Sequence, residues 1–280
     1  MSVETDITLP DKTSDLRQQY VVDGVVPVSG LLSGQLLSDI IEEVETFRET
    51  AELLGSATGS SGNQASRTSV KHLPGRSIVR GLAHTQGSVS TLVTNPSVAA
   101  FLAQVVGVNA VRYWNDLTLA YAPAAPAGES AWHHDLPAFP LRATEMPTLW
   151  IALSDVDWDS SPLVYARGSH VSGQLYPPTT ATDVDLPEGY TDMPDWDALV
   201  DAGSVEKVWW PMKPGDALIM HAKVVHCTPA NRNKKDERVS IITRWIGDDA
   251  VWHRDPYSTP IQGLPEQDWQ PGEPITRAFV

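Results

Sequence analysis

The stretch Ala131–Leu136, AWHHDL, places two histidines directly before a carboxylate. On a β-strand, side chains two positions apart point to the same face, so His133 and Asp135 would point together and His134 away from them. An imidazole and a carboxylate on one face provide two ligands for a metal ion. A second histidine would complete the ligand set that is typical of nonhaem Fe(II) oxygenase sites, which keep open coordination positions.

Two further histidines are candidates for the third ligand. His221 and His226 lie in DALIMHAKVVHC, and their spacing alone does not choose between them. Other interpretations of these residues are histidines satisfied within a β core, a His/His/Asp metalloenzyme that uses no cosubstrate, such as a zinc hydrolase, and a catalytically silent binding module on the same fold.

The second half of the chain predicts the β-structure that would position these residues. Short runs rich in β-branched and aromatic residues alternate with Pro, Gly, Asp and Asn turns, a pattern that favours a sandwich or jelly roll. The runs are AVRYWNDLTLAYAP, PTLWIALSDVDW, EKVWWPM, DALIMHAKVVHC and RVSIITRWIG.

Predicted helices cluster earlier in the chain. Residues 25–28 predict a strand, and Ser33 is a candidate cap for an amphipathic helix with apolar residues at helical spacing. A second helix is expected over Ser97–Val106, ending at Gly107. The expected fold is mainly β, with flanking helices around one core. The expected domain organisation is a flexible N-terminus over 1–18 followed by a single domain over 19–280.

Composition limits the classes of partner. The chain has 280 residues and a net charge of −15, so nucleic acid and anionic membranes are not expected partners. No apolar run is long enough to predict a membrane-spanning helix. A single cysteine, Cys227, agrees with a cytoplasmic location.

Two segments are candidate covers for a substrate site. The first, residues 55–85, begins as a Gly/Ser-rich loop and continues into a group of basic residues that could bind a substrate anion, or that could instead form salt bridges to acids elsewhere: Lys71, His72, Arg76, Arg80 and His84. The second, 172–206, contains eight acidic residues and no lysine or arginine, and long connections of this kind are usually either functional covers or disordered.

Four motifs in order resemble the phytanoyl-CoA dioxygenase family of Fe(II)/2-oxoglutarate-dependent oxygenases, over about residues 19–248. The opening strand and helix are similar, and WHHD resembles the family's W-H-x-D motif. TLWIALSDVDWDSSPLVYARGSH resembles its W-I-A-L, acidic and P-G-S-H stretch. The run KPGDALIMHAKVVHCTPANRNKKDERVSIITRW resembles the family's G-D, H-x-x-x-x-H, N and R pattern. This resemblance implies a double-stranded β-helix core of the cupin-like jelly-roll type.

The resemblance also assigns roles. It implies that His133, Asp135 and His226 bind the iron, with His226 chosen over His221 because Asn231 and Arg238 follow it. Arg238 would bind the distal carboxylate of 2-oxoglutarate, as suits a bidentate guanidinium. Further cosubstrate contacts are expected from three strand residues: Ser240, Thr148 and Trp150.

The implied activity is oxidation, with hydroxylation favoured, of a small-molecule metabolite by Fe(II), 2-oxoglutarate and O₂, with release of succinate and CO₂. A role in secondary metabolism is one possibility. Halogenating relatives lack the carboxylate ligand that Asp135 supplies, so halogenation is not expected. Two positions depart from the family: Arg167 replaces a proline, and Ala122 stands where a lysine is frequent.

Overall fold

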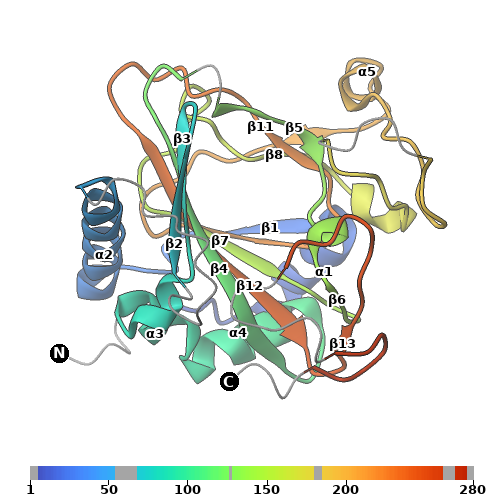
Figure 1. Ribbon diagram of the computed structural model, residues 1–280, viewed down its shortest axis with the longest axis horizontal. Coiled ribbons are helices and arrows are strands. Elements are labelled where there is room, and N and C mark those ends of the chain that lie inside the picture. The colour runs from blue at the N-terminus through green and yellow to red at the C-terminus, as the bar shows by residue number, and fades with distance from the viewer. Residues whose placement is uncertain (1–5, 54–67, 126–127, 180–184, 261–268, 276–280) are drawn as a thin grey trace.

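The computed structural model describes residues 6–53, 68–125, 128–179, 185–260 and 269–275 (Figure 1). Its α-helices are α1 (Thr13–Asp23), α2 (Gly34–Leu53), α3 (Ser88–Val93), α4 (Pro96–Val106) and α5 (Trp196–Asp201). Its strands are β1 (Val25–Val28), β2 (Ser69–Leu73), β3 (Arg76–Arg80), β4 (Val111–Tyr121), β5 (Ser130–His133), β6 (Leu141–Arg142), β7 (Thr148–Ala152), β8 (Val164–Ala166), β9 (Lys207–Val208), β10 (Ala217–Met220), β11 (His226–Thr228), β12 (Arg238–Gly247) and β13 (Val251–Trp252).

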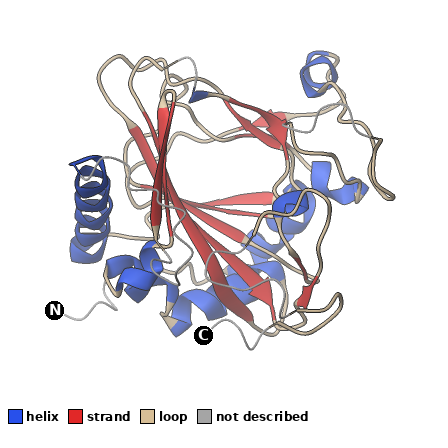
Figure 2. Ribbon diagram, viewed as in Figure 1, coloured by secondary structure: helices blue, strands red, loops and turns tan. Residues whose placement is uncertain are grey.

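Two antiparallel sheets form the core (Figure 2). The large sheet has the order β1-β10-β7-β12-β4-β3-β2, and the small sheet has the order β5-β11-β8-β9. The non-consecutive neighbours are the crossovers of a jelly roll. The predicted fold, mainly β with flanking helices and a jelly-roll core, is confirmed.

The helices α2, α3 and α4 cover the outer face of the large sheet, on the side away from the small sheet, whereas α5 lies on the side of the small sheet (Figure 1). One apolar cluster joins buried residues of α2, α3 and α4 to outward residues of the sheet, such as Ile151, Ile219 and Ile241. A second cluster fills the space between the sheets, with Trp150, Leu218 and Ile242 facing Tyr165. Within the described residues, no helix has the length and apolar character needed to cross a membrane.

Side chains alternate along β12, so that one face of the strand packs against the helices and the other lines the space between the sheets. Ile241 and Trp245 pack in the cluster below the helices. Arg238, Ile242 and Arg244 line a cavity on the opposite face, between the sheets. The large sheet thus presents an apolar face to its helices and a face containing arginines to the interior.

Local signals explain the helix that was predicted over residues 97–106. The Asn95 side chain accepts a hydrogen bond from the Ser97 N–H at 2.8 Å, and Pro96 occupies the first turn. Gly107 ends the helix at φ 83°, a backbone conformation that glycine adopts without steric cost. The helix α4 therefore ends where it was predicted to end and begins one residue earlier, at Pro96.

The N-terminal prediction is wrong in part. Residues 1–18 were expected to be flexible, but α1 begins at Thr13 and the chain is already paired at Ile7, which forms a β-bridge with Leu32. Asp6 accepts the N–H of Leu36 at 3.0 Å, so this distant carboxylate caps α2 in place of Ser33. Tertiary contacts order this segment although its sequence is polar, since Tyr20 of α1 is buried against the core.

The two segments expected to cover a substrate site differ in where they lie. In the first, residues 54–67 lie outside the described residues, and 69–80 form β2 and β3 at the edge of the large sheet. In the second, Tyr176 and Trp196 pack with Trp132 in a cluster on the small sheet, and the Trp132 indole donates to Asp197 at 3.1 Å. No described residue of 172–206 lines the cavity between the sheets.

Candidate active site

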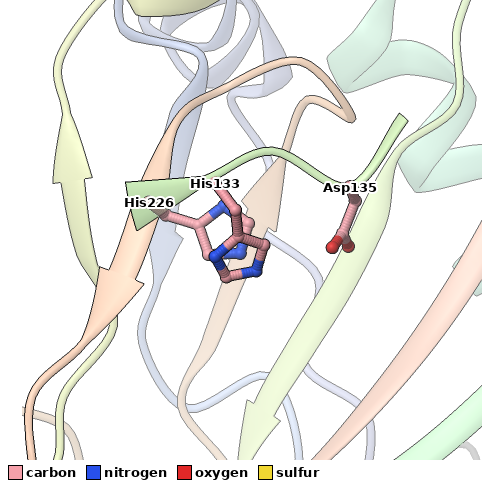
Figure 3. A group of neighbouring side chains, drawn as sticks. All are labelled: His133, Asp135 and His226. Carbon is pink, nitrogen blue, oxygen red and sulfur yellow. The ribbon is translucent and has the colours of Figure 1, made fainter. Parts of the chain in front are cut away.

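Three side chains that could bind a metal meet in the cavity between the sheets. One ligand atom from each of His133, Asp135 and His226 lies within 4.8 Å of the other two. Figure 3 shows the two imidazoles side by side, on β5 and β11, with Asp135 on the chain that follows β5. His133 and His226 are paired across these antiparallel strands, and their ring centroids are 4.3 Å apart. The register of the small sheet therefore brings the sequence-distant histidine to the H-x-D motif.

The imidazoles are oriented by the backbone. Nδ1 of His133 is 2.8 Å from the Ala131 carbonyl, and Nδ1 of His226 is 3.1 Å from the Val224 carbonyl. A carbonyl can only accept, so each Nδ1 carries the proton and each Nε2 keeps a free lone pair. Burial lowers the pKa of His226 to about 4, so this ring is neutral and able to ligate at neutral pH.

Asp135 reaches the cluster by a route that strand periodicity did not predict. The strand β5 ends at His133, and Asp135 has helical backbone angles at the start of a short 3₁₀ turn. Its Oδ2 accepts from Nη2 of Arg244 at 3.1 Å, which leaves Oδ1 for a metal. Burial alone would raise the pKa of Asp135, but Arg244 and the two histidines outweigh it and hold the pKa below its usual range.

The two other histidines of these motifs lie outside the cluster. His134 is buried on the opposite side, where its Nε2 accepts the N–H of Tyr176 at 3.0 Å. His221 packs between Tyr20 and His170, and its Nδ1 accepts the N–H of Lys223 at 2.9 Å. The sequence could not choose between His221 and His226; the structure brings only His226 of these two to the cluster.

Arg238 lines the same cavity and is fully buried. Its Nε donates to the Ser161 carbonyl at 3.0 Å, and its Nη1 donates to Ser240 at 2.7 Å. The guanidinium also lies 4.2 Å from the Tyr121 ring centroid. Its Nη2 has no hydrogen-bond partner among the described residues. A buried cation with one free donor is a site for an anionic oxygen.

Of the other three predicted cosubstrate residues, two line the cavity and one does not. Thr148 and Trp150 line the cavity from β7, as expected from their shared face. Ser240 does not line it; this hydroxyl accepts from Arg238 and so orients the guanidinium. Sequence reasoning missed Arg244, although its even separation of six residues from Arg238 along β12 was a usable signal that both side chains lie on one face.

Ser161 supports Arg238 from an unusual backbone position. Its φ is 63°, in the left-handed region that few non-glycine residues adopt. It is fully buried, and its hydroxyl donates to the Pro229 carbonyl. The strained turn thus directs the Ser161 carbonyl to Arg238, a contact that has no sequence signature.

Asn231 ties the loop between β11 and β12 to the sheet. Its amide donates to the carbonyls of Tyr121 and Asp236 at 3.1 and 3.2 Å, and its Oδ1 accepts the N–H of Asn233 at 3.0 Å. Asn231 is 1% exposed, so water cannot replace these bonds. The asparagine that follows the distal histidine in the motif therefore holds the start of β12, where Arg238 lies.

We expect Asn231→Ala to lower the free energy of unfolding by about 2–4 kcal/mol, because it leaves the buried Tyr121 carbonyl unpaired and also removes the partner of the Asp236 carbonyl and of the Asn233 N–H. Asn233→Ala is the matched control and should cost at most about 1 kcal/mol, since its side chain closes only a surface turn. Urea unfolding of both variants measures the difference. Equal losses would show that Asn231 has no special role in the loop.

Of the two residues that depart from the family pattern, Arg167 forms ion pairs and Ala122 contributes only a backbone contact. Arg167 donates to Asp23 and to Glu206, both at 2.7 Å, and is not among the residues that line the cavity. Ala122 has no side chain that could reach a ligand, and its N–H donates to the Gly75 carbonyl.

A jelly roll with a two-histidine, one-carboxylate cluster beside a buried arginine has the architecture of nonhaem iron oxygenases that use 2-oxoglutarate. Residues 20–240 match the family model described as phytanoyl-CoA dioxygenase (PhyH). The chain therefore belongs to the phytanoyl-CoA dioxygenase family and is an Fe(II)/2-oxoglutarate-dependent enzyme. No curated protein sequence gives a significant match.

Solved structures share this fold over nearly the whole chain. The epimerase SnoN, in complex with Fe³⁺, α-ketoglutarate and nogalamycin RO, is 21% identical with a TM-score of 0.68, over 94% of this chain and 95% of that one. The carbocyclase SnoK is 20% identical with a TM-score of 0.68, over 96% and 95%. EctD from S. alaskensis with bound Fe is 12% identical with a TM-score of 0.67, over 96% and 89%.

Proposed function

We propose that the protein oxidises a small-molecule metabolite, with His133, Asp135 and His226 holding Fe(II) and Arg238 holding 2-oxoglutarate. When bound, Fe(II) and 2-oxoglutarate would activate O₂ for attack on a substrate C–H bond, with succinate and CO₂ as coproducts. Hydroxylation is the favoured outcome. Epimerisation and ring closure begin with the same loss of a hydrogen atom, and the similarity to SnoN and SnoK keeps them as alternatives.

The observation that supports this function is a set of unpaired polar atoms around one cavity. Among the described residues, five buried donors in its wall have no hydrogen-bond partner: Arg238 Nη2, Arg244 Nε, Thr148 Oγ1, Trp150 Nε1 and Ser130 Oγ. Unpaired buried donors are costly in a folded protein, so their convergence indicates a polar ligand. An acid with two carboxylates and a keto oxygen suits this donor set.

Each residue has a defined task in this proposal. The free Nε2 atoms of His133 and His226 and the free Oδ1 of Asp135 supply three ligands, which leaves open positions for the cosubstrate and O₂. Arg238 would pair with the distal carboxylate, and Thr148 and Trp150 would donate to other oxygens of the acid. The apolar residues Leu117, Leu163 and Ile242 line the rest of the cavity and exclude water from it.

The direct test is anaerobic addition of Fe(II) and 2-oxoglutarate to the metal-free protein. We expect the weak visible absorption band that Fe(II)/2-oxoglutarate enzymes show, and succinate formation once air is admitted. The control is N-oxalylglycine in place of 2-oxoglutarate, which should bind but give no succinate. A protein that binds Zn²⁺ and hydrolyses esters but forms no band with 2-oxoglutarate would favour the zinc hydrolase. A protein that binds neither would be a silent module.

Screening succinate release over a metabolite library would then identify the substrate. The product should gain an oxygen atom, lose hydrogen or, after epimerisation, keep the formula of the substrate, and it should carry no halogen because Asp135 fills the position that a halide would need. A chlorinated product in chloride buffer, detected by mass spectrometry, would contradict this assignment. Similarity to enzymes of nogalamycin biosynthesis supports a secondary metabolite as substrate. A cytoplasmic location remains a prediction.

A further inference from the structure

A second group of cations faces the interior from β3. Along this strand Val79 packs below the helices, whereas Ile78 packs between the sheets. Alternation therefore points Arg76 and Arg80 inward with Ile78. Arg76 lines the cavity directly.

The sheet register places Arg80 beside Arg244. Arg80 pairs with Leu117 of β4, and Leu117 pairs on its other side with Ile242 of β12. Arg244 is the next inward residue along β12, and its Nη1 donates to Asn115 at 3.3 Å. Burial lowers the pKa of Arg80, and the positive charge of Arg244 lowers it further, as expected for neighbouring guanidiniums.

The charges of these two arginines are not balanced. Arg244 is paired with Asp135 at 3.1 Å. Arg80 is partly buried, yet among the described residues it has no hydrogen bond and no ion pair. The chain has 35 acidic residues against 20 lysines and arginines, so partners for a cation are abundant. An arginine on an inward face of such a protein, without a partner in the described part of the chain, is a candidate site for an anion from outside the chain.

The Arg80 position is distinct from the proposed cosubstrate anchor. Arg238 pairs with Tyr121 on β4, and Arg80 pairs with Leu117, four residues earlier on the same strand. At about 3.4 Å per residue these positions are roughly 14 Å apart along the strand. A 2-oxoglutarate molecule held by Arg238 therefore leaves Arg80 free. Because Arg244 contacts Asp135, an anion held between Arg80 and Arg244 would lie next to the proposed iron site.

We propose that Arg80, with Arg244 beside it, binds an anionic oxygen group of the substrate, so that the substrate is an organic anion. This inference rests on the proposed function, because it takes the cavity as an oxygenase site. Guanidinium groups bind carboxylates through paired N–H donors, and Leu117 offers an apolar surface for the body of the molecule. The expected substrate class is a small, largely apolar acid.

A matched pair of probes tests the proposal without knowledge of the natural substrate. Naphthalene-2-carboxylate and naphthalene-2-carboxamide have the same shape and differ in charge. Each is titrated calorimetrically into the anaerobic complex of the protein with Fe(II) and 2-oxoglutarate. We expect the wild type to bind the carboxylate at least about 10-fold more tightly than the amide, the range of a hydrogen bond to a charged group.

Two variants test whether Arg80 is the residue that causes the tighter binding of the carboxylate probe. Arg80→Gln should remove it and leave the dissociation constant of 2-oxoglutarate within about 2-fold, because Arg238 is untouched. Arg112→Gln is the control: Arg112 lies exposed on β4, and its loss changes net charge equally. This variant should keep the preference.

Three outcomes would overturn the proposal. They are equal binding of the two probes by wild type, a preference that survives in Arg80→Gln, and an equal loss in Arg112→Gln, which would indicate long-range electrostatics. The wild-type comparison needs no variant, so a poorly folded Arg80→Gln does not remove the test. Failure of Fe(II) and 2-oxoglutarate to bind would instead contradict the proposed function, and it is seen before any probe is added.

Discussion

His226→Ala should abolish iron binding and turnover, whereas His221→Ala should keep bound iron. His226 offers Nε2 to the cluster, and its removal leaves a two-ligand site of one histidine and one carboxylate. His221 lies in a separate group with Tyr20 and His170. Its loss removes a partly buried ring but no candidate ligand.

The measurement is iron content after anaerobic loading and gel filtration, with thermal unfolding of each variant as a check on folding. A His226→Gln variant keeps the side-chain volume and should lose iron as His226→Ala does. Iron retained by His226→Ala and lost by His221→Ala would show that the distal ligand is His221. Iron retained in both would remove both histidines from the metal site.

Much of the fold could be predicted because it depends on local patterns. The strand at residues 25–28, the helix that Asn95 and Gly107 delimit, and the β-rich runs after residue 110 all match elements of the structure. In each case periodicity or a capping residue acts over a few neighbouring positions. The sequence also placed Thr148 and Trp150 on one face of a strand, and both line the cavity.

Features that depend on distant contacts could not be predicted. The helix α1 is held by tertiary packing, and its own sequence is polar. Asp135 was expected to extend a strand, yet it reaches the cluster from a 3₁₀ turn, so the prediction named the right residue for the wrong geometric reason. The contact between Arg244 and Asp135 spans 109 positions, and that between Arg238 and Ser161 spans 77, so neither leaves a local pattern.

Arg80 shows how sequence and structure differ in what they resolve. In the sequence it was one of five basic residues whose simplest explanation was salt bridging. In the structure Lys71 and His72 are exposed, whereas Arg80 is partly buried on the inward face of the large sheet, near Arg244. Strand register, which depends on pairing between β3 and β4, is the information that the sequence lacked.

Arg238→Lys should raise the KM for 2-oxoglutarate by at least about 10-fold, which corresponds to about 1.4 kcal/mol. Lysine keeps the charge but loses the planar fork. In the wild type, Nε and Nη1 are fixed by Ser161 and Ser240 and direct the free Nη2 into the cavity. An ammonium group cannot satisfy the Ser161 carbonyl and a carboxylate with the same geometry, so both contacts weaken.

Ser240→Ala separates orientation from direct binding. The hydroxyl touches the guanidinium and does not line the cavity, so its loss should raise the KM for 2-oxoglutarate by less than Arg238→Lys does, about 2- to 5-fold for one neutral partner of a buried cation. Initial rates of succinate release at varied 2-oxoglutarate give the KM values. Calorimetric titration of 2-oxoglutarate into the Fe(II)-loaded protein gives the affinity independently of turnover. An unchanged affinity in Arg238→Lys would move the anchor to another residue, and Arg76, which also lines the cavity, would be the next to test.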